Sequence, residues 1–284
     1  YFLLPGNLTD LISQSGVTGG AGAYLNPFMN GDRPYTFIEI FSQLAWGFGY
    51  CGMPHVLVRF MAVKNEKELK KSWAIAIVWD LLSLTAAFAI AVIGRAYLLP
   101  VILGENGAAS SESVFIEMIR KVFTSELALP FIGGLFLCGI LAAIMSTADS
   151  QLLVTASAVS EDLYHSFIKK DADTEEILKV SRITVIAIAV IAFAIAWNPD
   201  SSIMGLVSNA WAGLGSAFGP IVVMSLFWRR TNLPGAIAGM VTGGLTVIIW
   251  DYIPLVGGQT LGTYTGLYSL AVGFLLSLVM IVIV

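Results

Sequence analysis

The stretch Ala45–His55, AWGFGYCGMPH, interrupts an apolar run that is otherwise typical of a helix. A glycine costs a helix interior about 1 kcal/mol relative to alanine, and a proline costs about 3 kcal/mol. Proline also frees the carbonyl four residues earlier, and an unsatisfied backbone group is costly inside a bilayer. If this run crosses a membrane, protein or a water-filled cavity must surround the interruption. The stretch therefore predicts a helix that is broken near its middle.

Composition indicates that a membrane is the setting of this helix. The chain has 284 residues, of which 57% are hydrophobic and 12% are charged, whereas soluble domains carry about twice that share of charge. Long apolar runs recur without the alternation that is typical of barrel strands. We therefore predict an all-α polytopic membrane protein, with residues 1–284 forming one transmembrane domain. Because apolar segments lie at both ends, we expect this domain to be truncated at both ends.

The apolar runs divide into seven expected spans, at residues 36–62, 73–98, 129–168, 180–197, 203–228, 234–252 and 264–284. Basic residues are distributed unequally around these spans. The loops after the first, third and fifth spans, together with Arg59, hold 11 lysines and arginines, and the opposite side holds 4. Because cytoplasmic loops are enriched in basic residues, we expect residues 1–35 to lie outside the cell.

Three large residues lie on one face of the interrupted span. Trp46, Tyr50 and Pro54 follow one another at i, i+4 and i+8, so a helix would place them together. A span interrupted by glycine or proline points to the mid-membrane binding site of a secondary transporter, and aromatic side chains beside small residues can form a pocket wall. A glycine-rich face that packs against another helix is the alternative. It accounts for the glycines but does not require the aromatic residues.

A second pattern lies in the third span, within the stretch GILAAIMSTADSQLL. Four of its residues share one helix face: Ala143, Ser146, Thr147 and Ser150. Hydroxyl and carbonyl oxygens are ligands that hard cations prefer, although serine and threonine can instead bond back to their own helix. Asp149 borders this face, and a carboxylate inside a span is costly and usually functional. It could serve a cation site or line the cytoplasmic exit, and a structural hydrogen bond is the alternative.

Two further features carry weaker signals. The stretch SNAWAGLGSAFGP in the fifth span holds Trp211 and Phe218 among glycines, and either a hinge of the external pathway or helix packing explains it. Glu39 and Asp251 lie near the external ends of their spans, where their side chains can reach water.

Three long motifs resemble one known family. They are WGFGYCGMPHVLVRFMA, AAIMSTADSQLLVTASAVSEDLY and GLVSNAWAGLGSAFGP, and together they are similar to the sodium/solute symporter (SSS) family, closest to its sodium/proline branch. The resemblance runs in order over essentially the whole chain. It implies a LeuT-type inverted repeat, in which spans one to five are core helices 6–10 and the last two are peripheral. The first repeat, with the other broken helix, would be absent.

The resemblance also implies a sodium site. Ser146 and Thr147 match hydroxyl ligands of that site, and Ala143 matches its backbone carbonyl ligand. The remaining ligands would come from the absent first core helix. Asp149 and Ser150 stand where some members place a second cation site, and Asp149 replaces the serine that is usual there.

For the interrupted span, the resemblance matches Trp46, Tyr50 and Pro54 to positions associated with proline binding. It implies sodium-coupled uptake of L-proline by alternating access across the plasma membrane, in a bacterium the inner membrane. The implied partners are a small solute, co-transported sodium and membrane lipids, with no nucleic acid. Symport of another small amino or organic acid, and a symporter-like sensor domain, are the alternatives.

An intramembrane enzyme is a third class of function. Its chemical group would be Asp149 or Ser146, but neither has a histidine or a second carboxylate beside it at a helical spacing. We therefore expect a transporter and assign no catalytic residues.

Overall fold

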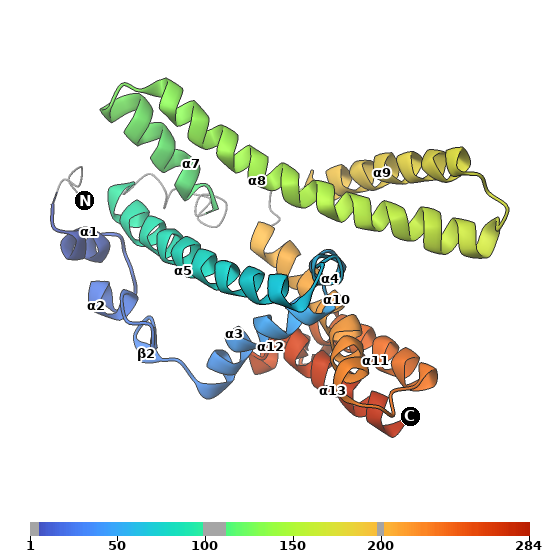
Figure 1. Cartoon of the computed structure of the whole chain (residues 1–284). Helices are drawn as coiled ribbons and strands as arrows, with labels where there is room; N and C mark the ends of the chain where they lie inside the picture. Colours follow the sequence, from blue (N-terminus) through green and yellow to red (C-terminus); the bar gives the residue numbers. More distant parts are fainter. Residues whose placement is uncertain (1–5, 99–111, 198–201) are drawn as a thin grey trace. The chain divides into compact units, whose positions relative to one another are not determined.

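The computed structural model describes residues 6–98, 112–197 and 202–284, which are coloured along the chain in Figure 1. The chain forms two compact units. One unit contains residues 1–15 and 78–202, and the other contains residues 16–77 and 203–284. The boundary between residues 77 and 78 falls inside helix α5 (Glu66–Tyr97). Each unit is therefore built from two separate segments of the chain.

Five helices among the described residues are long and apolar enough to cross a membrane. They are α5, α8 continued by η4 (Pro130–Ile168), α9 (Thr174–Ala196), α10 (Ile203–Phe227) and α11 (Leu233–Tyr252). Their most apolar stretches have a mean hydropathy between 1.6 and 2.2, and about 20 residues suffice to cross a bilayer. A shorter apolar helix, α13 (Ser269–Ile283), follows them. The prediction of a helical polytopic membrane protein is confirmed.

The first predicted span is broken, as its glycines and proline indicate. Helix α3 (Phe37–Gly49) passes into a 3₁₀ turn, η1 (Tyr50–Gly52), and helix α4 (Pro54–Met61) begins at the proline. Met53 between them is extended, with φ -86° and ψ 112°, which is the conformation favoured before proline. Proline suits the first position of α4 because a backbone N–H there would have no intrahelical partner.

One carboxylate fastens the start of α3 to the hairpin before it. Thr36 caps the helix by accepting from the Glu39 N–H at 3.3 Å, and the Glu39 carboxylate accepts from the Thr36 N–H at 2.8 Å. Arg33 donates to both Glu39 oxygens, at 2.8 and 2.7 Å. The preceding elements are α2 (Gly20–Tyr24) and the antiparallel strands β1 (Met29–Asn30) and β2 (Arg33–Pro34). Glu39 therefore completes the helix cap and pairs with the hairpin at once.

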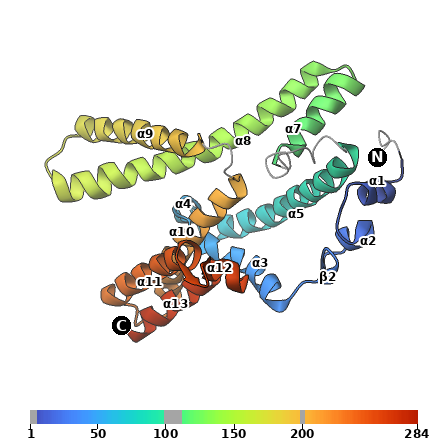
Figure 2. The same cartoon turned by 180° about the vertical axis from the view of Figure 1, so that it is seen from behind.

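In the unit that contains residues 78–202, α8 and α9 lie side by side, as seen from behind in Figure 2. The other elements of this unit are α1 (Leu8–Gln14), the second part of α5, α7 (Val114–Ile119), η3 (Arg120–Glu126) and η4 (Ala158–Ile168), which continues α8 (Pro130–Ser157). Both η3 and η4 are π-helical, a winding that is rare beyond a single turn.

Glu176 joins the end of η4 to the start of α9. Its carboxylate accepts from the Tyr164 hydroxyl at 2.7 Å and from Lys169 Nζ at 2.6 Å. The hydrogen bond to Glu176 also raises the pKa of Lys169. The connection between the two helices is therefore fixed by a shared carboxylate.

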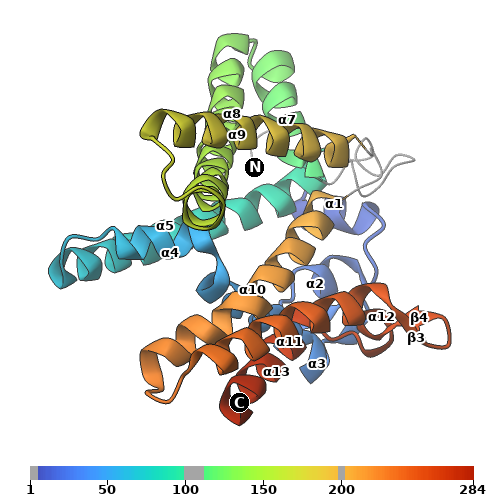
Figure 3. The same cartoon turned by 90° about the vertical axis from the view of Figure 1, so that its right-hand side faces the viewer.

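In the unit that contains residues 203–284, helices α10, α11 and α13 pack against one another (Figure 3). Small residues permit their close approach. A Cβ atom on Gly243 of α11 would overlap the backbone carbonyl of Ser216 on α10, and one on Gly273 of α13 would lie 2.8 Å from the Ser216 Cβ. Ser216 and Leu270 are fully buried among these helices. The contact between α10 and its two neighbours therefore depends on the absence of side chains.

A polar connection joins α11 to α13. It consists of strands β3 (Pro254–Val256) and β4 (Gln259–Thr260), which pair antiparallel, and the short helix α12 (Leu261–Thr265). Thr260 caps α12 by accepting from the Thr263 N–H at 3.3 Å. Gly266 ends it in the left-handed conformation, with φ 67°, which glycine adopts without strain.

Two adjacent glycines of α11 test the packing of this unit. A Cβ on Gly243 would overlap the Ser216 backbone, which has no rotamer freedom to give way, whereas a Cβ on Gly244 would meet nothing within 4 Å. We expect Gly243→Ala to lower the stability of the full-length protein by about 1–3 kcal/mol, and Gly244→Ala to leave it unchanged or slightly raised. Thermal denaturation in detergent measures both variants, and equal midpoints would contradict the packing described above.

Candidate functional site

The broken helix packs against α10 through its glycines. A Cβ on Gly49 would overlap the indole of Trp211, and one on Gly52 would lie 2.6 Å from the Leu214 carbonyl oxygen. A Cβ on Gly47, by contrast, would meet nothing within 4 Å. Close packing therefore accounts for Gly49 and Gly52, and this packing occurs together with the break in the backbone.

Trp211 bonds to the backbone close to the point where α3 ends. Helix α3 passes into the 3₁₀ turn at Tyr50, so regular α-helical bonding stops close to Trp46. The indole Nε1–H of Trp211 donates to the Trp46 carbonyl at 3.0 Å. The two indoles also stack, with ring centroids 5.4 Å apart and an interplanar angle of 13°. One side chain of α10 therefore adds a hydrogen bond to the backbone next to the interruption.

Further aromatic side chains surround this contact. Tyr268, the residue before α13, stacks on Trp46 at a centroid distance of 5.9 Å. Tyr50 meets Trp211 edge-on, at 4.8 Å and 84°. Each such pair contributes about 0.5–1.5 kcal/mol beyond the burial of its area. The cluster therefore holds α3 and the turn after it against α10 and the start of α13.

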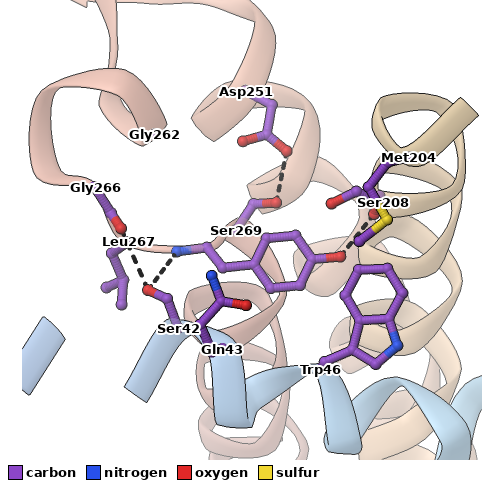
Figure 4. Close-up of a pocket in the computed structure, with 11 residues that line it drawn as sticks. Ser42, Gln43, Trp46, Met204, Ser208, Asp251, Gly262, Gly266, Leu267 and Ser269 are labelled. Atoms are coloured by element: carbon purple, nitrogen blue, oxygen red, sulfur yellow. Dashed lines mark hydrogen bonds between the residues drawn. The ribbon is translucent and has the colours of Figure 1, made fainter. Parts of the chain in front are cut away.

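A cavity of about 360 Å³ lies beside the aromatic cluster, and Figure 4 shows its lining side chains. The residues around it come from α3, α10, α11 and the connection before α13. The Ser42 hydroxyl accepts from the Tyr268 N–H at 3.1 Å and donates to the Gly266 carbonyl at 3.3 Å. The Tyr268 hydroxyl donates to the Ser208 carbonyl at 2.7 Å. The cavity is therefore a polar recess with an aromatic wall, formed within one unit.

The three residues predicted to bind substrate lie at different places around the break. Trp46 is partly buried and lines the cavity. Tyr50 is 53% exposed and does not belong to the cavity lining. Pro54 begins α4 and fixes the end of the interruption. Trp46 and Tyr50 share one neighbour, the Trp211 indole, while their role in binding stays a prediction.

The predicted cation ligands lie on α8, in the unit that contains residues 78–202. The Thr147 hydroxyl donates to the Ala143 carbonyl at 3.3 Å, so these two oxygens are neighbours on the helix surface. The Ser150 hydroxyl donates to the Ser146 carbonyl at 2.9 Å. Both bonds are the return to the helix backbone that is the alternative to ligation. A hydroxyl can rotate from this bond to a cation while the carbonyl stays beside it, and ligation stays a prediction.

Asp149 lies on the same helix with an exposed side chain. Among the residues that the structure describes, it has no ion pair or side-chain hydrogen bond. The described part of the chain also holds no group of three His, Cys, Asp or Glu side chains that could bind a metal. A cation site on α8 would therefore use hydroxyl and carbonyl oxygens, with Asp149 as a nearby negative charge.

Sequence reasoning missed the partners of the broken helix. Trp211 stood out in its glycine-rich stretch, but nothing local indicated that its indole bonds to a residue 165 positions earlier. Tyr268 gave no signal at all. Asp251 was placed near the end of its span, and the structure adds its partner, because its carboxylate accepts from the Ser269 hydroxyl at 2.5 Å.

The fold and this site define a class of protein, a polytopic helical membrane protein with an interrupted helix. The model of the sodium:solute symporter family matches residues 25–243. The chain therefore belongs to the sodium:solute symporter family, and it is a multi-pass protein of the plasma membrane.

Individual relatives are proline transporters by name. The chain is 45% identical over 247 residues to the osmoregulated proline transporter OpuE of Bacillus subtilis. The matched region covers 87% of this chain and 47% of that protein. It is 41% identical over 249 residues to the sodium/proline symporter of Escherichia coli, with the same two shares of 87% and 47%. It is 39% identical over 270 residues to the high-affinity proline transporter PutP of Bacillus subtilis, covering 92% and 53%.

The chain spans about half the length of these curated relatives, with shares of 47%, 47% and 53%. No solved structure is significantly similar to it. The sequence comparisons therefore establish the family. The fold is known only from the helices and contacts described above.

The bond between Trp211 and the Trp46 carbonyl can be tested with a conservative change. Trp211→Phe keeps an aromatic ring but removes the Nε1–H, so the part-buried Trp46 carbonyl loses this donor. We expect a loss of stability of about 1–3 kcal/mol, measured as a lower denaturation midpoint of the full-length protein. Trp73→Phe, at a ring that is 68% exposed, is the matched control and should change the midpoint little. A Trp211→Phe variant as stable as this control would contradict the role of the indole.

Proposed function

We propose that the full-length protein couples the inward movement of sodium to the uptake of L-proline. The observation that carries this proposal is membership of the symporter family over residues 25–243. Relatives at 39% to 45% identity bear the names of proline transporters and a sodium/proline symporter, which supports the choice of substrate. The proposal is transport without covalent chemistry, and it assigns no catalytic residue.

The proposed architecture is a LeuT-type inverted repeat. The broken helix α3–α4, then α5, α8, α9 and α10, would be core helices 6–10, and α11 and α13 would be peripheral. The interruption of α3–α4 supports this assignment, because secondary transporters use discontinuous helices at their mid-membrane binding sites. The excess of basic residues in alternate loops supports an orientation with residues 1–35 outside the cell.

The break offers both charges that a zwitterion requires. The end of α3 presents backbone carbonyls, and the start of α4 presents backbone N–H groups. A carboxylate can therefore bind at the start of α4, and an ammonium can bind at the end of α3. An aromatic face such as that of Trp46 attracts an ammonium by roughly 0.5–2 kcal/mol. Trp46 and Tyr50 would also cover the apolar ring of proline.

Sodium would bind to α8 through Ala143, Ser146 and Thr147, with further ligands from outside this chain. The neighbouring oxygens of Thr147 and Ala143, 3.3 Å apart, support this site because a hard cation prefers oxygen ligands. Asp149 and Ser150 would contribute negative charge and a hydroxyl nearer the cytoplasm. Because the two binding events are linked, sodium must raise proline affinity by the factor by which proline raises sodium affinity.

Removing the two hydroxyls of α8 tests the sodium site. In the full-length protein, Ser146→Ala combined with Thr147→Ala should raise the sodium concentration needed for half-maximal proline uptake by roughly 10-fold or more. Proline uptake into cells is measured against external sodium concentration. The matched control is Thr155→Ala, because the Thr155 hydroxyl also bonds back to α8, at the Gln151 carbonyl. A sodium dependence equal to that of the control would contradict the assignment of Ser146 and Thr147 as sodium ligands.

Two substitutions test the substrate-binding prediction. Trp46→Ala and Tyr50→Phe should each raise the proline concentration for half-maximal uptake, Tyr50→Phe by about 2- to 10-fold if its hydroxyl bonds to substrate. Tyr252→Phe, at a tyrosine that is 60% exposed, is the control. If the variants change only the amount of protein in the membrane, these residues serve packing. Competition by other amino and organic acids in the same assay separates proline from the alternative substrates.

A further inference from the structure

The cavity beside α3 contains a charged group that the proposed transport site does not use. This group is Asp251, near the end of α11, and its side chain points into the region drawn in Figure 4. Its Oδ2 accepts from the Ser269 hydroxyl. Its Oδ1 accepts no hydrogen bond from the part of the chain that the structure describes. One carboxylate oxygen is therefore available to a ligand.

Most other polar groups of the cavity already bond to one another. Ser42 bonds to Tyr268 and Gly266, and the Tyr268 hydroxyl bonds to Ser208. Gln43 is different, because its exposed side chain lines the cavity without a hydrogen bond to a described residue. The Ser208 hydroxyl also has no hydrogen bond to a described residue. The side chains that can receive a ligand are thus a carboxylate, an amide and one hydroxyl.

These groups suit an organic ammonium. A carboxylate forms charge-assisted hydrogen bonds with an ammonium. The rings of Trp46 and Tyr268 border the same cavity, and aromatic rings attract cations through cation–π interactions. The amide of Gln43 can donate to a carboxylate on the same solute. The volume of about 360 Å³ lies near the lower end of ligand pockets, roughly 300–1,000 Å³, which suits a small molecule.

A bare metal cation fits this lining less well. Hard cations bind through a shell of several oxygens, whereas the hydroxyls of Ser42 and Tyr268 are engaged with the backbone around them. Asp251 is joined by no other acidic side chain in the lining. The lining is aromatic and amide-bearing instead, which favours a charged organic group.

We propose that this cavity is an outer docking site for the ammonium group of a zwitterionic solute, held by Asp251 with Gln43 and Trp46. The inference rests on the proposed function, which supplies the outward orientation of the end of α11 and the class of solute. Trp46 belongs both to this cavity and to the predicted transport site at the break. A solute held by Asp251 is therefore bound before it reaches the break, and the carboxylate raises the local concentration of ammonium groups.

A reporter thiol in the cavity measures the electrostatic effect of Asp251 on charged reagents, and it does so without a transport assay. Met204 lines the cavity and is 59% exposed, so Met204→Cys is introduced after Cys51, Cys138 and any other cysteines of the full-length protein are replaced. Intact cells are treated with two impermeant methanethiosulfonates, one bearing trimethylammonium and one bearing sulfonate. We expect Asp251→Asn to lower the ratio of the cationic to the anionic reaction rate by roughly 10-fold.

Matched variants keep the result interpretable if Asp251→Asn fails to fold. Asp251→Glu preserves the charge and should preserve the ratio of rates. Asp32→Asn removes an exposed carboxylate of the same unit that lies outside the cavity, and it should leave the ratio unchanged. The proposal is overturned if the ratio of the cationic to the anionic reaction rate is the same in the protein with Asp251 and in the Asp251→Asn variant. A reporter thiol that external reagents never reach also overturns it.

The solute itself supplies the second measurement. Proline should slow the reaction of the reporter thiol, and Asp251→Asn should weaken that protection and raise the KM for proline uptake roughly 10-fold, with kcat unchanged. Protection by sodium alone, with none by proline, overturns the ammonium assignment. If the unmodified protein shows no sodium-dependent proline uptake, the proposed function fails. In that case, the ratio of the two reaction rates at the thiol still decides whether Asp251 attracts cationic groups into the cavity.

Discussion

A chain that crosses a bilayer must satisfy its own backbone, and the bond between the Trp211 indole and the Trp46 carbonyl does this where α3 stops. This bond joins the end of α3 to α10 directly. The same indole stacks on Trp46 and meets Tyr50. A side chain from another helix therefore supports the backbone next to the break.

That bond in turn depends on close approach between helices. Gly49 leaves room for the Trp211 ring, and Gly52 leaves room for the backbone of α10. Behind α10, the glycines Gly243 and Gly273 let α11 and α13 contact Ser216 directly. Small residues therefore let α10, α11 and α13 pack closely together, and aromatic residues join α10 and the start of α13 to the broken helix. The cavity with Asp251 lies where these helices meet the polar connection before α13.

The helical membrane fold and the break were predictable because both follow from local composition. Apolar runs determine which segments cross a bilayer, and the cost of glycine and proline appears at the residues that carry them. The partners of the break were not predictable, since Trp211 reaches Trp46 across 165 positions and Tyr268 contacts Ser42 across 226. Spacing likewise placed Thr147 beside Ala143, but it did not distinguish a bond to the helix backbone from a bond to a cation.

The C-terminal end of the helical run that begins with α8 affects how motion can pass along this chain. The helical run Pro130–Ile168 is 39 residues long, about twice the length that crosses a bilayer, and its last 11 residues are π-wound. Rewinding such a segment to α-helix moves each hydrogen bond by one residue, which turns the residues beyond it about the helix axis. Because Glu176 fastens the end of this segment to α9, such a turn would reach the next helix as torsion.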